Sequence, residues 1–326
     1  MFRLSPMRNS EMPTESADLD PLIGEFAAAR PGAVLILATG DRTNELDAPI
    51  GGSSVEPLAQ RPSRTGAKDR EARARIERPN TNSSSAEHFD VAIVGSGGGA
   101  FAAAIGASER GARVVMIERG TLGGTCINTG CIPSKSQLHA GELFWQAGHH
   151  GFQGIRTEAV SVDLGRLVEQ KDELVARLRQ AKYADVIAAH GWELVQGEAS
   201  FLDPHTLTVG DRLIAADAFV LATGARPAVP RVPGLDRVDY LTSTSLLDLK
   251  TLPEHLIVMG AGYVGLELGQ LFRHLGARVT LMQRRGRVLA EFDPEIGHTM
   301  RDLLTAEGME LMTGVMYVRA QRSTMG

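Results

Sequence analysis

The sequence predicts an α/β protein with two doubly wound units, because the order apolar strand, glycine-rich turn, helix and second strand occurs in it twice. The stretch from Gly95 to Glu118 aligns without gaps with the stretch from Gly260 to Gln283. Both copies enter their second strand through Gly-Ala-Arg-Val. A repeat of this kind predicts two parallel sheets with helices packed on them.

Each element of these units has its own local pattern. A short apolar run that ends in glycines predicts a buried parallel strand at Phe89–Val94. A helix is predicted at Phe101–Arg110 and a second strand at Arg113–Glu118. Helical spacing of apolar residues covers Leu164–His190. Alternating patterns then predict a small β-meander at Glu193–Val209 and Arg212–Leu221. Another apolar strand, which begins at Leu256, opens the second unit.

Length and composition restrict the class of protein. The 326 residues suffice for about two domains plus additional sequence, and 43% of them are hydrophobic, which is enough to form cores. The net charge of −5 gives no indication of binding to nucleic acid or to an anionic membrane. No apolar run reaches the roughly 18 residues that span a bilayer, and no basic segment precedes an apolar one at the N-terminus. Together these features predict a cytoplasmic protein.

Three regions are expected along the chain. Residues 1–87 are rich in Pro, Ser, Thr, Asn and charged residues, which predicts a disordered leader or linker. Within them the apolar island Pro31–Thr39 could form a strand, for which the sequence indicates no partner. Residues 88–230 are expected to form the first doubly wound unit, and residues 231–326 the second.

The first glycine loop has the residues that a dinucleotide-binding turn requires. Gly95 permits the tight turn, Gly97 lets the backbone approach a pyrophosphate, and Ala100 lets the helix pack closely on the strand. The N-terminus of that helix would face the phosphates. Glu118 ends the next strand, where its carboxylate can accept hydrogen bonds from a ribose diol. A glycine-rich turn without a ligand is the alternative.

The second loop repeats this pattern with Gly260, Gly262 and Gly265, but its acidic residue is replaced. The position in register with Glu118 holds Gln283, and two arginines follow it. Loss of the carboxylate removes repulsion toward a 2′-phosphate, and arginines donate hydrogen bonds to phosphate oxygens. The second loop therefore predicts NADPH rather than NADH, with Arg284 and Arg285 at the phosphate. Solvated loop arginines are the alternative.

The only two cysteines lie five residues apart, in Gly-Gly-Thr-Cys126-Ile-Asn-Thr-Gly-Cys131. Residues five apart in a regular helix are roughly 8–9 Å apart between Cα atoms, whereas a disulfide needs less than about 7 Å. A Cys126–Cys131 bond therefore requires a distorted segment, which Gly130 permits. Pro133 suits the first turn of a following helix, whose N-terminus favours a thiolate at the second sulfur, and Lys135 adds positive charge.

Half of a zinc site is the alternative for this pair. Structural zinc takes four ligands, and the sequence has no further cysteine. His139 alone does not complete the set. The pattern therefore favours a redox-active pair.

These motifs together resemble the pyridine nucleotide–disulfide oxidoreductases over roughly residues 88–320. The cysteine motif carries the family resemblance, and Gly262-Tyr-Val-Gly-Leu-Glu267 is shared widely within the family. The surrounding sequence is most similar to the mercuric reductases. That similarity lies in Glu118-Arg-Gly-Thr, Leu178-Arg-Gln-Ala-Lys-Tyr183, Leu241-Thr-Ser-Thr-Ser-Leu-Leu-Asp248 and Leu281-Met-Gln-Arg284.

The resemblance implies an order of electron transfer from NADPH through FAD to the cysteines. Cys131 would be the thiol nearer the flavin, and Cys126 the outer thiol that meets the substrate. Lys135 would lie by the flavin N5 and pair with Glu267. Tyr263 would be a movable lid over the nicotinamide pocket, although a packing residue and a solvated lysine are the ordinary alternatives for Tyr263 and Lys135.

The resemblance also implies further contacts to FAD. Gly120 and Thr125 would line its site, and Gly197-Glu-Ala199 would lie by the adenine. Ala222-Thr223-Gly224, after the strand Ala218–Leu221, would close the FAD domain.

The implied substrate is a metal ion or a small molecule. Hg²⁺ is soft and prefers two thiolates, so Cys126 and Cys131 would bind it and Hg(II) would be reduced to Hg(0). A dihydrolipoamide dehydrogenase-type enzyme and an inactive remnant are the alternatives. The family is homodimeric, and the resemblance indicates that the returning FAD segment and the C-terminal dimerisation domain are missing here. The chain alone is therefore expected to have little or no mercuric reductase activity.

Overall fold

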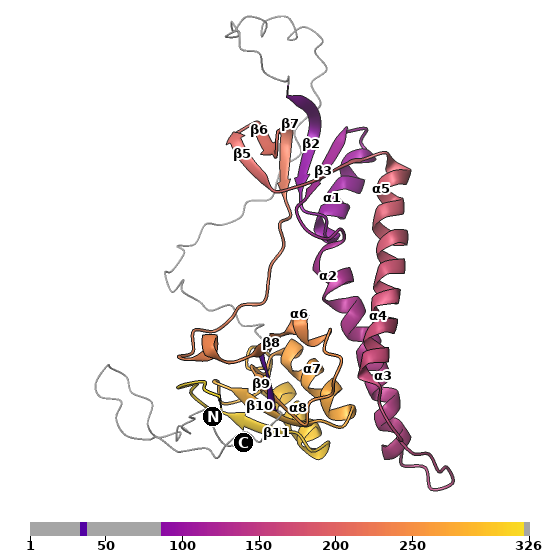
Figure 1. Ribbon diagram of the computed structural model, residues 1–326, viewed down its shortest axis with the longest axis vertical. Helices are drawn as coiled ribbons and strands as arrows, with labels where there is room; N and C mark the ends of the chain where they lie inside the picture. The colour runs from indigo at the N-terminus through magenta and orange to yellow at the C-terminus, as the bar shows by residue number, and fades with distance from the viewer. Residues whose placement is uncertain (1–32, 38–85, 323–326) are drawn as a thin grey trace, which may run out of the picture.

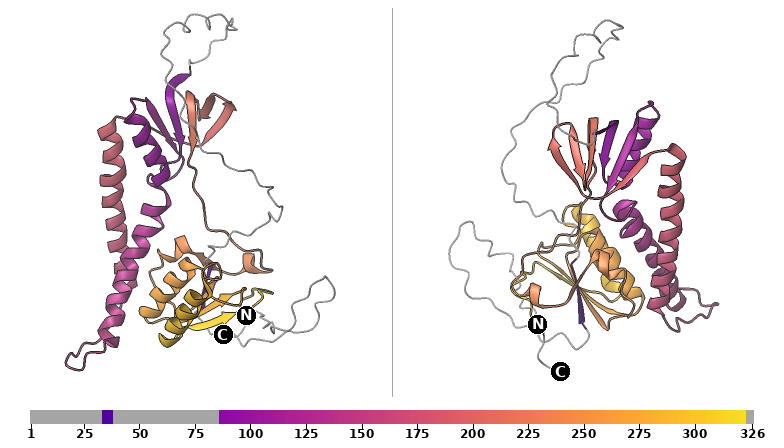
Figure 2. Two further views of the ribbon diagram at one scale, coloured as in Figure 1. Left: turned by 180° about the vertical axis from the view of Figure 1, so that it is seen from behind. Right: turned by 45° about the horizontal axis from the view of Figure 1, so that its top comes forward.

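A computed structural model describes residues 33–37 and 86–322, which form two sheets connected by long helices (Figure 1). The sheet order is β4-β3-β2-β7-β6-β5 in the first unit and β11-β10-β9-β1-β8 in the second. The long helices α3 (Cys131–His149) and α4 (Leu164–Arg179) run side by side from the first sheet to the flank of the second (Figure 2). The predicted α/β class with two doubly wound units is confirmed.

The first sheet combines a parallel part with an antiparallel meander. β2, β3, β4 and β7 are parallel neighbours, whereas β5 and β6 return antiparallel onto β7. Buried side chains of β2 and β3, such as Ile93 and Met116, face the helices that cover the sheet. The strands are β2 Glu87–Val94, β3 Val114–Glu118, β4 Glu193–Gln196, β5 Ala199–Asp203, β6 Thr206–Val209 and β7 Arg212–Leu221.

The helices of this part follow the glycine loop and the cysteine motif. α1 packs closely on the sheet because Ala100 and Ala104 are fully buried against it. A π-helical turn at Gln180–Ala184 interrupts the predicted helical segment and separates α4 from α5. The helices are α1 Gly98–Ser108, α2 Gly124–Asn128, α3 Cys131–His149, α4 Leu164–Arg179 and α5 Asp185–His190.

The second sheet is parallel throughout. Every residue of its central strand β9 is buried, as expected for a strand covered on both faces. The strands are β1 Ala33–Leu37, β8 Tyr240–Thr242, β9 His255–Met259, β10 Arg278–Gln283 and β11 Glu310–Thr313. The helices are α6 Ser243–Leu246, α7 Tyr263–His274 and α8 Pro294–Ala306, with a 3₁₀ turn at Leu235–Arg237.

One expectation about the leader is wrong. The apolar island does have a partner, because Ala33–Leu37 is a strand that pairs in parallel with both β8 and β9. Its partners are more than 200 positions away along the chain, so no local pattern could indicate them. The rest of the expected leader, residues 1–32 and 38–85, lies outside the described residues, and the proposed division into domains stays a prediction.

Helices α3 and α7 hold the two units together. A Cβ atom on Gly141 of α3 would lie 2.8 Å from Leu271 Cδ1 of α7. The two helices can therefore approach this closely only because Gly141 has no side chain. Gln137 Nε2, which is buried, donates a 3.0 Å hydrogen bond to the Leu247 carbonyl of the second unit. The contact between the units therefore contains both apolar packing and a buried polar group with a partner.

A buried lysine adds to this contact. The Lys171 side chain on α4 is only 3% exposed, and its Nζ lies 2.5 Å from Asp248 and 2.8 Å from Asp172. Burial disfavours the charged form of Lys171, but the hydrogen bonds and charges of the two aspartates outweigh it and raise the pKa of the lysine. Lys171 is therefore a charged group that links α4 to the segment before β9.

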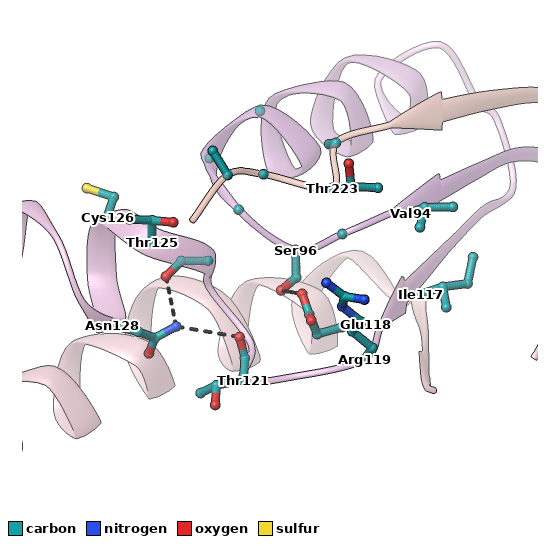
Figure 3. Close-up of a pocket in the computed structure, with 18 of the residues that line it drawn as sticks. Val94, Ser96, Ile117, Glu118, Arg119, Thr121, Thr125, Cys126, Asn128 and Thr223 are labelled. Carbon is teal, nitrogen blue, oxygen red and sulfur yellow. Dashed lines mark hydrogen bonds between the residues drawn. The ribbon is translucent and has the colours of Figure 1, made fainter. Parts of the chain in front are cut away.

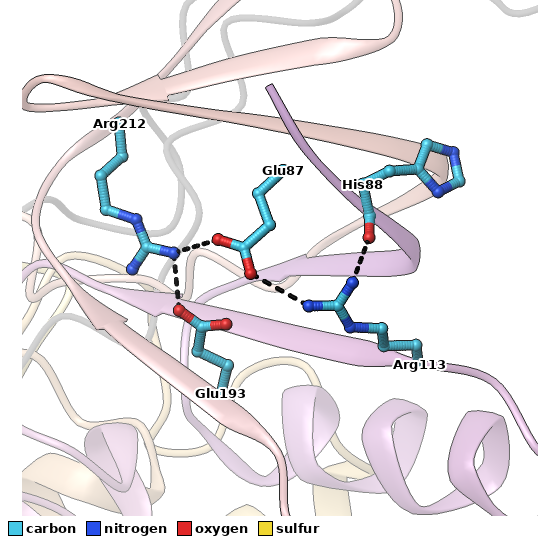
Figure 4. A network of polar contacts seen from close by, with 5 residues as sticks. All are labelled: Glu87, His88, Arg113, Glu193 and Arg212. Carbon is cyan, nitrogen blue, oxygen red and sulfur yellow. Dashed lines mark hydrogen bonds and ion pairs between the residues drawn. The ribbon is translucent and has the colours of Figure 1, made fainter. Parts of the chain in front are cut away.

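An ionic network ties the amino ends of the first sheet's parallel strands (Figure 4). Arg212 Nη2 lies 2.6 Å from both Glu87 and Glu193. Arg113 Nη2 lies 3.0 Å from Glu87, and its Nη1 donates to the His88 carbonyl. The network joins the starts of β2, β3, β4 and β7, so it lies at the edge of the sheet opposite the carboxyl ends.

The close packing of α3 on α7 predicts that Gly141→Leu lowers the free energy of unfolding by about 1–3 kcal/mol, because a side chain forced into a packed contact strains its surroundings. Urea titration followed by circular dichroism measures this. Gly148→Leu is the matched control, since Gly148 lies on the same helix but is exposed and meets only Ala159 at 3.8 Å. Equal effects of the two substitutions would contradict the role of this helix contact.

Candidate functional site

An open cleft of about 700 Å³ lies at the carboxyl ends of β2, β3 and β7. Ligands of doubly wound sheets bind at this edge. Cys126 lies near one end of the cleft, and the Ser96–Glu118 pair lies further along it (Figure 3). The sequence-predicted residues that line it are Gly95, Gly97, Glu118, Thr125, Cys126, Gly197, Glu198, Ala199, Ala222, Thr223 and Gly224.

The first glycine loop has room for a phosphate group beside the start of α1. No atom lies within 4 Å of the positions that Cβ atoms would take on Gly98 and Gly99. Gly97 caps α1 without any side-chain hydrogen bond, and no acidic residue occupies the first turn. Free backbone N–H groups at a helix N-terminus favour an anion. These residues therefore fit the pyrophosphate of a dinucleotide.

Gly95 is required by the fold itself. Its φ is +111°, and a Cβ atom there would lie 2.1 Å from the Ala222 carbonyl oxygen. The Ala222 N–H donates in turn to the Val94 carbonyl, at 2.9 Å. The turn and the end of β7 are thus in direct backbone contact.

The Glu118 carboxylate is held by two donors at the edge of the cleft. Ser96 Oγ donates to Glu118 Oε2 at 2.5 Å, and the Gly120 N–H donates to Oε1 at 2.7 Å. Ser96 Oγ also accepts from the Gly123 N–H. Gly120, predicted to line the FAD site, lies outside the lining of the cleft and instead fixes Glu118. Oxygen lone pairs of the carboxylate remain for a ribose hydroxyl.

The cysteine motif folds as two helices separated by a sharp break. Cys126 lies in α2 and Cys131 begins α3, as the expected distortion requires. Gly130 between them has φ −123° and ψ −115°, outside the regions open to most residues. A Cβ atom on Gly130 would also lie 3.0 Å from the Thr125 carbonyl oxygen.

The two sulfurs are adjacent, exposed and unbonded in this structure. A side-chain hydrogen bond with Cys131, burial and the Cys131 charge together raise the pKa of the Cys126 thiol. The predicted disulfide is not formed in this structure and stays a prediction for the oxidised protein. Cys126 lines the cleft, whereas Cys131 lies outside its lining, at the N-terminus of α3.

Tyr183 is a neighbour of the cysteines for which no role was predicted. It lies in the π-helical turn, and burial followed by the charges of Cys126 and Cys131 raises its pKa. Its ring packs edge to face on Phe101, with 4.6 Å between centroids. Helix irregularities of this type occur frequently at functional sites, but this one leaves no local signal in the sequence.

Asn128 is a second neighbour that sequence reasoning missed. Its Nδ2 donates 2.9 Å hydrogen bonds to the Leu122 and Gly124 carbonyls, and its Oδ1 accepts from Arg179 Nε at 2.8 Å. The Asn128 side chain therefore bonds to the start of α2 and to the turn before it, and it also connects α2 to α4.

Lys135 and Glu267 form the pair that the resemblance implies. Lys135 Nζ on α3 lies 2.5 Å from Glu267 Oε1 on α7. The side chains are 58% and 42% exposed, so water screens the attraction and its net contribution to stability is small. The pair connects the cysteine helix to the helix of the second glycine loop.

A smaller hollow of about 120 Å³ lies at the second glycine loop. Gly260, Gly262, Tyr263, Gln283 and Arg285 line it, whereas Arg284 is exposed beside it and Gly265 is buried within α7. Gly262 caps α7 without a side-chain hydrogen bond, and no atom lies within 4 Å of its Cβ position. This loop therefore also leaves room for a phosphate at a helix N-terminus.

The segment from Leu289 to Phe292 forms the other wall of this hollow. Arg287 Nη2 donates to the Ala290 and Phe292 carbonyls, and Arg285 lies 3.7 Å from Glu291. This wall was not predicted, because its position depends on contacts of Arg287, to which no role was assigned, and of Arg285, whose role stayed open between phosphate binding and solvation.

Comparison with known proteins places the chain in a family. The family model described as "Pyridine nucleotide-disulphide oxidoreductase" matches residues 89–325. The chain belongs to this family. By family it is an oxidoreductase, as the sequence predicted, and mercuric reductases and flavoprotein disulfide reductases use FAD and NADPH, the two predicted cofactors.

Individual relatives agree with this assignment. A mercuric reductase of Staphylococcus aureus is 51% identical over 235 residues, which cover 72% of this chain and 43% of the relative. A mercuric reductase of Shigella flexneri is 38% identical over 298 residues, covering 88% of this chain and 52% of the relative. The chain thus spans about half the length of these relatives.

A solved structure shows the same fold. The Cu(II) complex of the HOCl-induced flavoprotein disulfide reductase RclA from Escherichia coli matches with a TM-score of 0.60 at 29% identity, covering 69% of this chain and 49% of that one. Within the described residues, no helix is both long and apolar enough to cross a membrane. Nor does that part of the chain contain a group of three His, Cys, Asp or Glu side chains that could hold a metal ion.

The open space at the glycine loop predicts different effects for two neighbouring glycines. Gly97→Ala meets only Gly124 Cα at 3.8 Å and has an ordinary φ of −79°, so the flavin-free protein should keep its melting temperature. FAD affinity should fall about tenfold or more, since 1.4 kcal/mol of lost phosphate contact suffices for that. Gly95→Ala, the comparison variant, should lower the melting temperature itself. Isothermal titration with FAD and thermal unfolding separate the effects; an unchanged FAD affinity for Gly97→Ala would contradict the assigned phosphate site.

The contact between the thiols predicts a shift in the reactivity of Cys126. Because the thiolate is the nucleophile and the pKa of Cys126 is raised, its alkylation rate should increase with pH only above the ordinary thiol range. Cys131→Ala removes both the hydrogen bond and the charge, so the midpoint should move to lower pH. Iodoacetamide labelling quantified by mass spectrometry measures the profile. Superimposable profiles of the reduced protein and the variant would refute the coupling.

Proposed function

We propose that this chain carries the nucleotide-binding and dithiol parts of a mercuric ion reductase, in which electrons pass from NADPH through FAD to the Cys126–Cys131 pair and Hg(II) is reduced to Hg(0). The observation that carries the proposal is the position of the pair. Cys126 lines a cleft suited to a dinucleotide, and Cys131 begins the helix that packs on the second unit. We place the protein in the cytoplasm.

The thiols are suited to a soft metal ion. Both are exposed, so a substrate can reach them, and they are close enough to contact each other. A soft divalent ion prefers thiolate sulfur, and binding displaces the two protons. Cys126 is assigned the outer position, and Cys131 the position nearer the flavin.

The residues of the cleft define how FAD would be held. Its pyrophosphate would lie along Gly95, Gly97 and the start of α1, with the ribose at Glu118 and the adenine near Ala199. Bound there, FAD would supply two-electron transfer between a nicotinamide and the thiol pair. Ala100 and Gly120 act indirectly, the first through helix packing and the second through Glu118.

The second hollow is assigned to NADPH. Its pyrophosphate would lie at Gly260, Gly262 and the start of α7, the helix on which Gly265 is buried. Gln283 brings no negative charge, and Arg284 and Arg285 would donate to the 2′-phosphate. Arg285 would have to leave Glu291, to which it is only weakly bound at 3.7 Å. Tyr263 is 60% exposed at the mouth of the hollow, so it is free to move as a lid.

Anaerobic reduction tests the electron path. The FAD-loaded chain should expose two additional thiols per NADPH consumed, measured by thiol titration. Added Hg²⁺ should leave as volatile Hg(0) in a single turnover, measured by atomic absorption, with little or none of the repeated turnover of a complete reductase, as expected for this chain alone. Cys126→Ala and Cys131→Ala should each abolish both signals while FAD remains bound. Thiols without Hg(0), together with oxidation of NADPH by a small disulfide, would establish the alternative disulfide reductase instead.

The exposed ion pair predicts a kinetic effect without a stability effect. Lys135→Met should change the melting temperature by less than about 2 °C, because a screened pair contributes no more than about 1 kcal/mol. If Lys135 lies by the flavin, the rate of flavin reduction by NADPH should fall about tenfold or more, because the loss of 1.4 kcal/mol of transition-state stabilisation suffices. Stopped-flow absorbance measures the rate, and Arg166→Met, at another exposed pair, is the control. An unaltered rate would remove Lys135 from the proposed site.

A further inference from the structure

The N-terminal strand β1 occupies a position in the second sheet that corresponds to β7 in the first. In the first unit Ala218, Val220 and Leu221 of β7 pair with Val91, Ile93 and Val94 of β2. In the second, Val34, Ile36 and Leu37 of β1 pair with Leu256, Val258 and Met259 of β9. The internal repeat equates these residues of β2 with those of β9 one by one. The two strands therefore have the same register on equivalent partners.

The sequences of the two strands support this equivalence independently. Leu221 and Leu37 pair with equivalent residues, Val94 of β2 and Met259 of β9. The residues that follow are Ala-Thr-Gly-Ala-Arg after Leu221 and Ala-Thr-Gly-Asp-Arg after Leu37. The repeat thus extends beyond the glycine loops to the strand that closes each sheet. In the first unit that strand comes last, whereas in the second it comes first in the chain.

The second sheet needs a strand at this point. β8 reaches β9 only through β1, because the order is β9-β1-β8. Neighbouring strands are about 4.8 Å apart, so β8 and β9 would otherwise be separated by an empty strand position. All residues of β9 are buried, and a buried strand with one row of unpaired backbone groups would be strongly unfavourable. The β8–α6–β9 crossover therefore leaves room for one inserted strand.

We propose that Ala33–Leu37 is the closing strand of the second nucleotide-binding unit, supplied from the N-terminal part of the chain in the position that β7 fills in the first unit. The strand β7 leads directly into Ala222 and Thr223, which line the first cleft. By this equivalence β1 stabilises the carboxyl edge of the second sheet, where the second glycine loop lies. The N-terminal segment is then a structural requirement for nucleotide binding rather than a detached leader.

Hydrogen exchange on the full-length protein tests the proposal directly. Amides of residues 34–37 should exchange at least about a hundredfold more slowly than in an unstructured peptide, as in strands of a stable sheet. This measurement needs neither cofactor nor activity, so its outcome is independent of the proposed function. Exchange of these amides at the rate of an unstructured peptide would overturn the proposal.

Proline substitution locates the strand. Leu35→Pro removes a backbone donor from the centre of the sheet and should accelerate exchange in β8 and β9, but not in β2 and β3. Phe219→Pro, at the register-equivalent position of β7, should give the reverse pattern. Val160→Pro, in an exposed segment outside both sheets, should change neither. Unaltered exchange of β9 in Leu35→Pro would overturn the proposal. Leu35→Pro should also weaken NADPH binding about tenfold or more while FAD still binds. This part of the test rests on the proposed function. If even the unmodified chain fails to bind NADPH, the proposed function fails while the exchange result stands.

Discussion

The candidate site depends on two close backbone contacts around the first glycine loop. Gly95 lies against the Ala222 carbonyl, and a Cβ atom on Gly124 would lie 2.6 Å from Gly97 Cα. These contacts bring the end of β2, the end of β7 and the start of α2 together, which shapes the cleft and sets Cys126 at its lip. A side chain at Gly95 or Gly124 would have to displace backbone atoms. Because such a displacement costs free energy in a closely packed region, the shape of the site is rigid.

The two units are connected by buried contacts and by an exposed ion pair. Only the buried contacts contribute much to stability. The packing of Gly141 on Leu271, with buried Lys171 and Gln137, excludes water and contributes to stability. The Lys135–Glu267 pair lies in water and contributes little. The contact between the units therefore depends on the buried groups and not on the exposed pair.

The repeat shows how one frame provides two different sites. Arg113 donates to the His88 carbonyl at the start of β2, and its counterpart Arg278 contacts the His255 side chain at the start of β9, so in both copies this arginine contacts the amino edge of the sheet. At the carboxyl edge the copies differ: Glu118 is fixed by Ser96 and Gly120, whereas Gln283 is neutral and buried. The shared edge preserves the fold, whereas the edge that differs lies beside the two glycine loops.

Features that depend on neighbouring residues could be predicted from the sequence. These are the glycines with a required φ, the strand–loop–helix order, the break at Gly130 and the helix that starts at Cys131, because all of them follow from local sterics. Other features became visible only in the folded chain. The partners of Ala33–Leu37, the position of Tyr183 beside the cysteines and the wall from Leu289 to Phe292 depend on contacts between segments far apart in the chain or on arginine pairings. Such contacts depend on which distant surface offers the best burial and hydrogen bonding, and no local pattern records that choice.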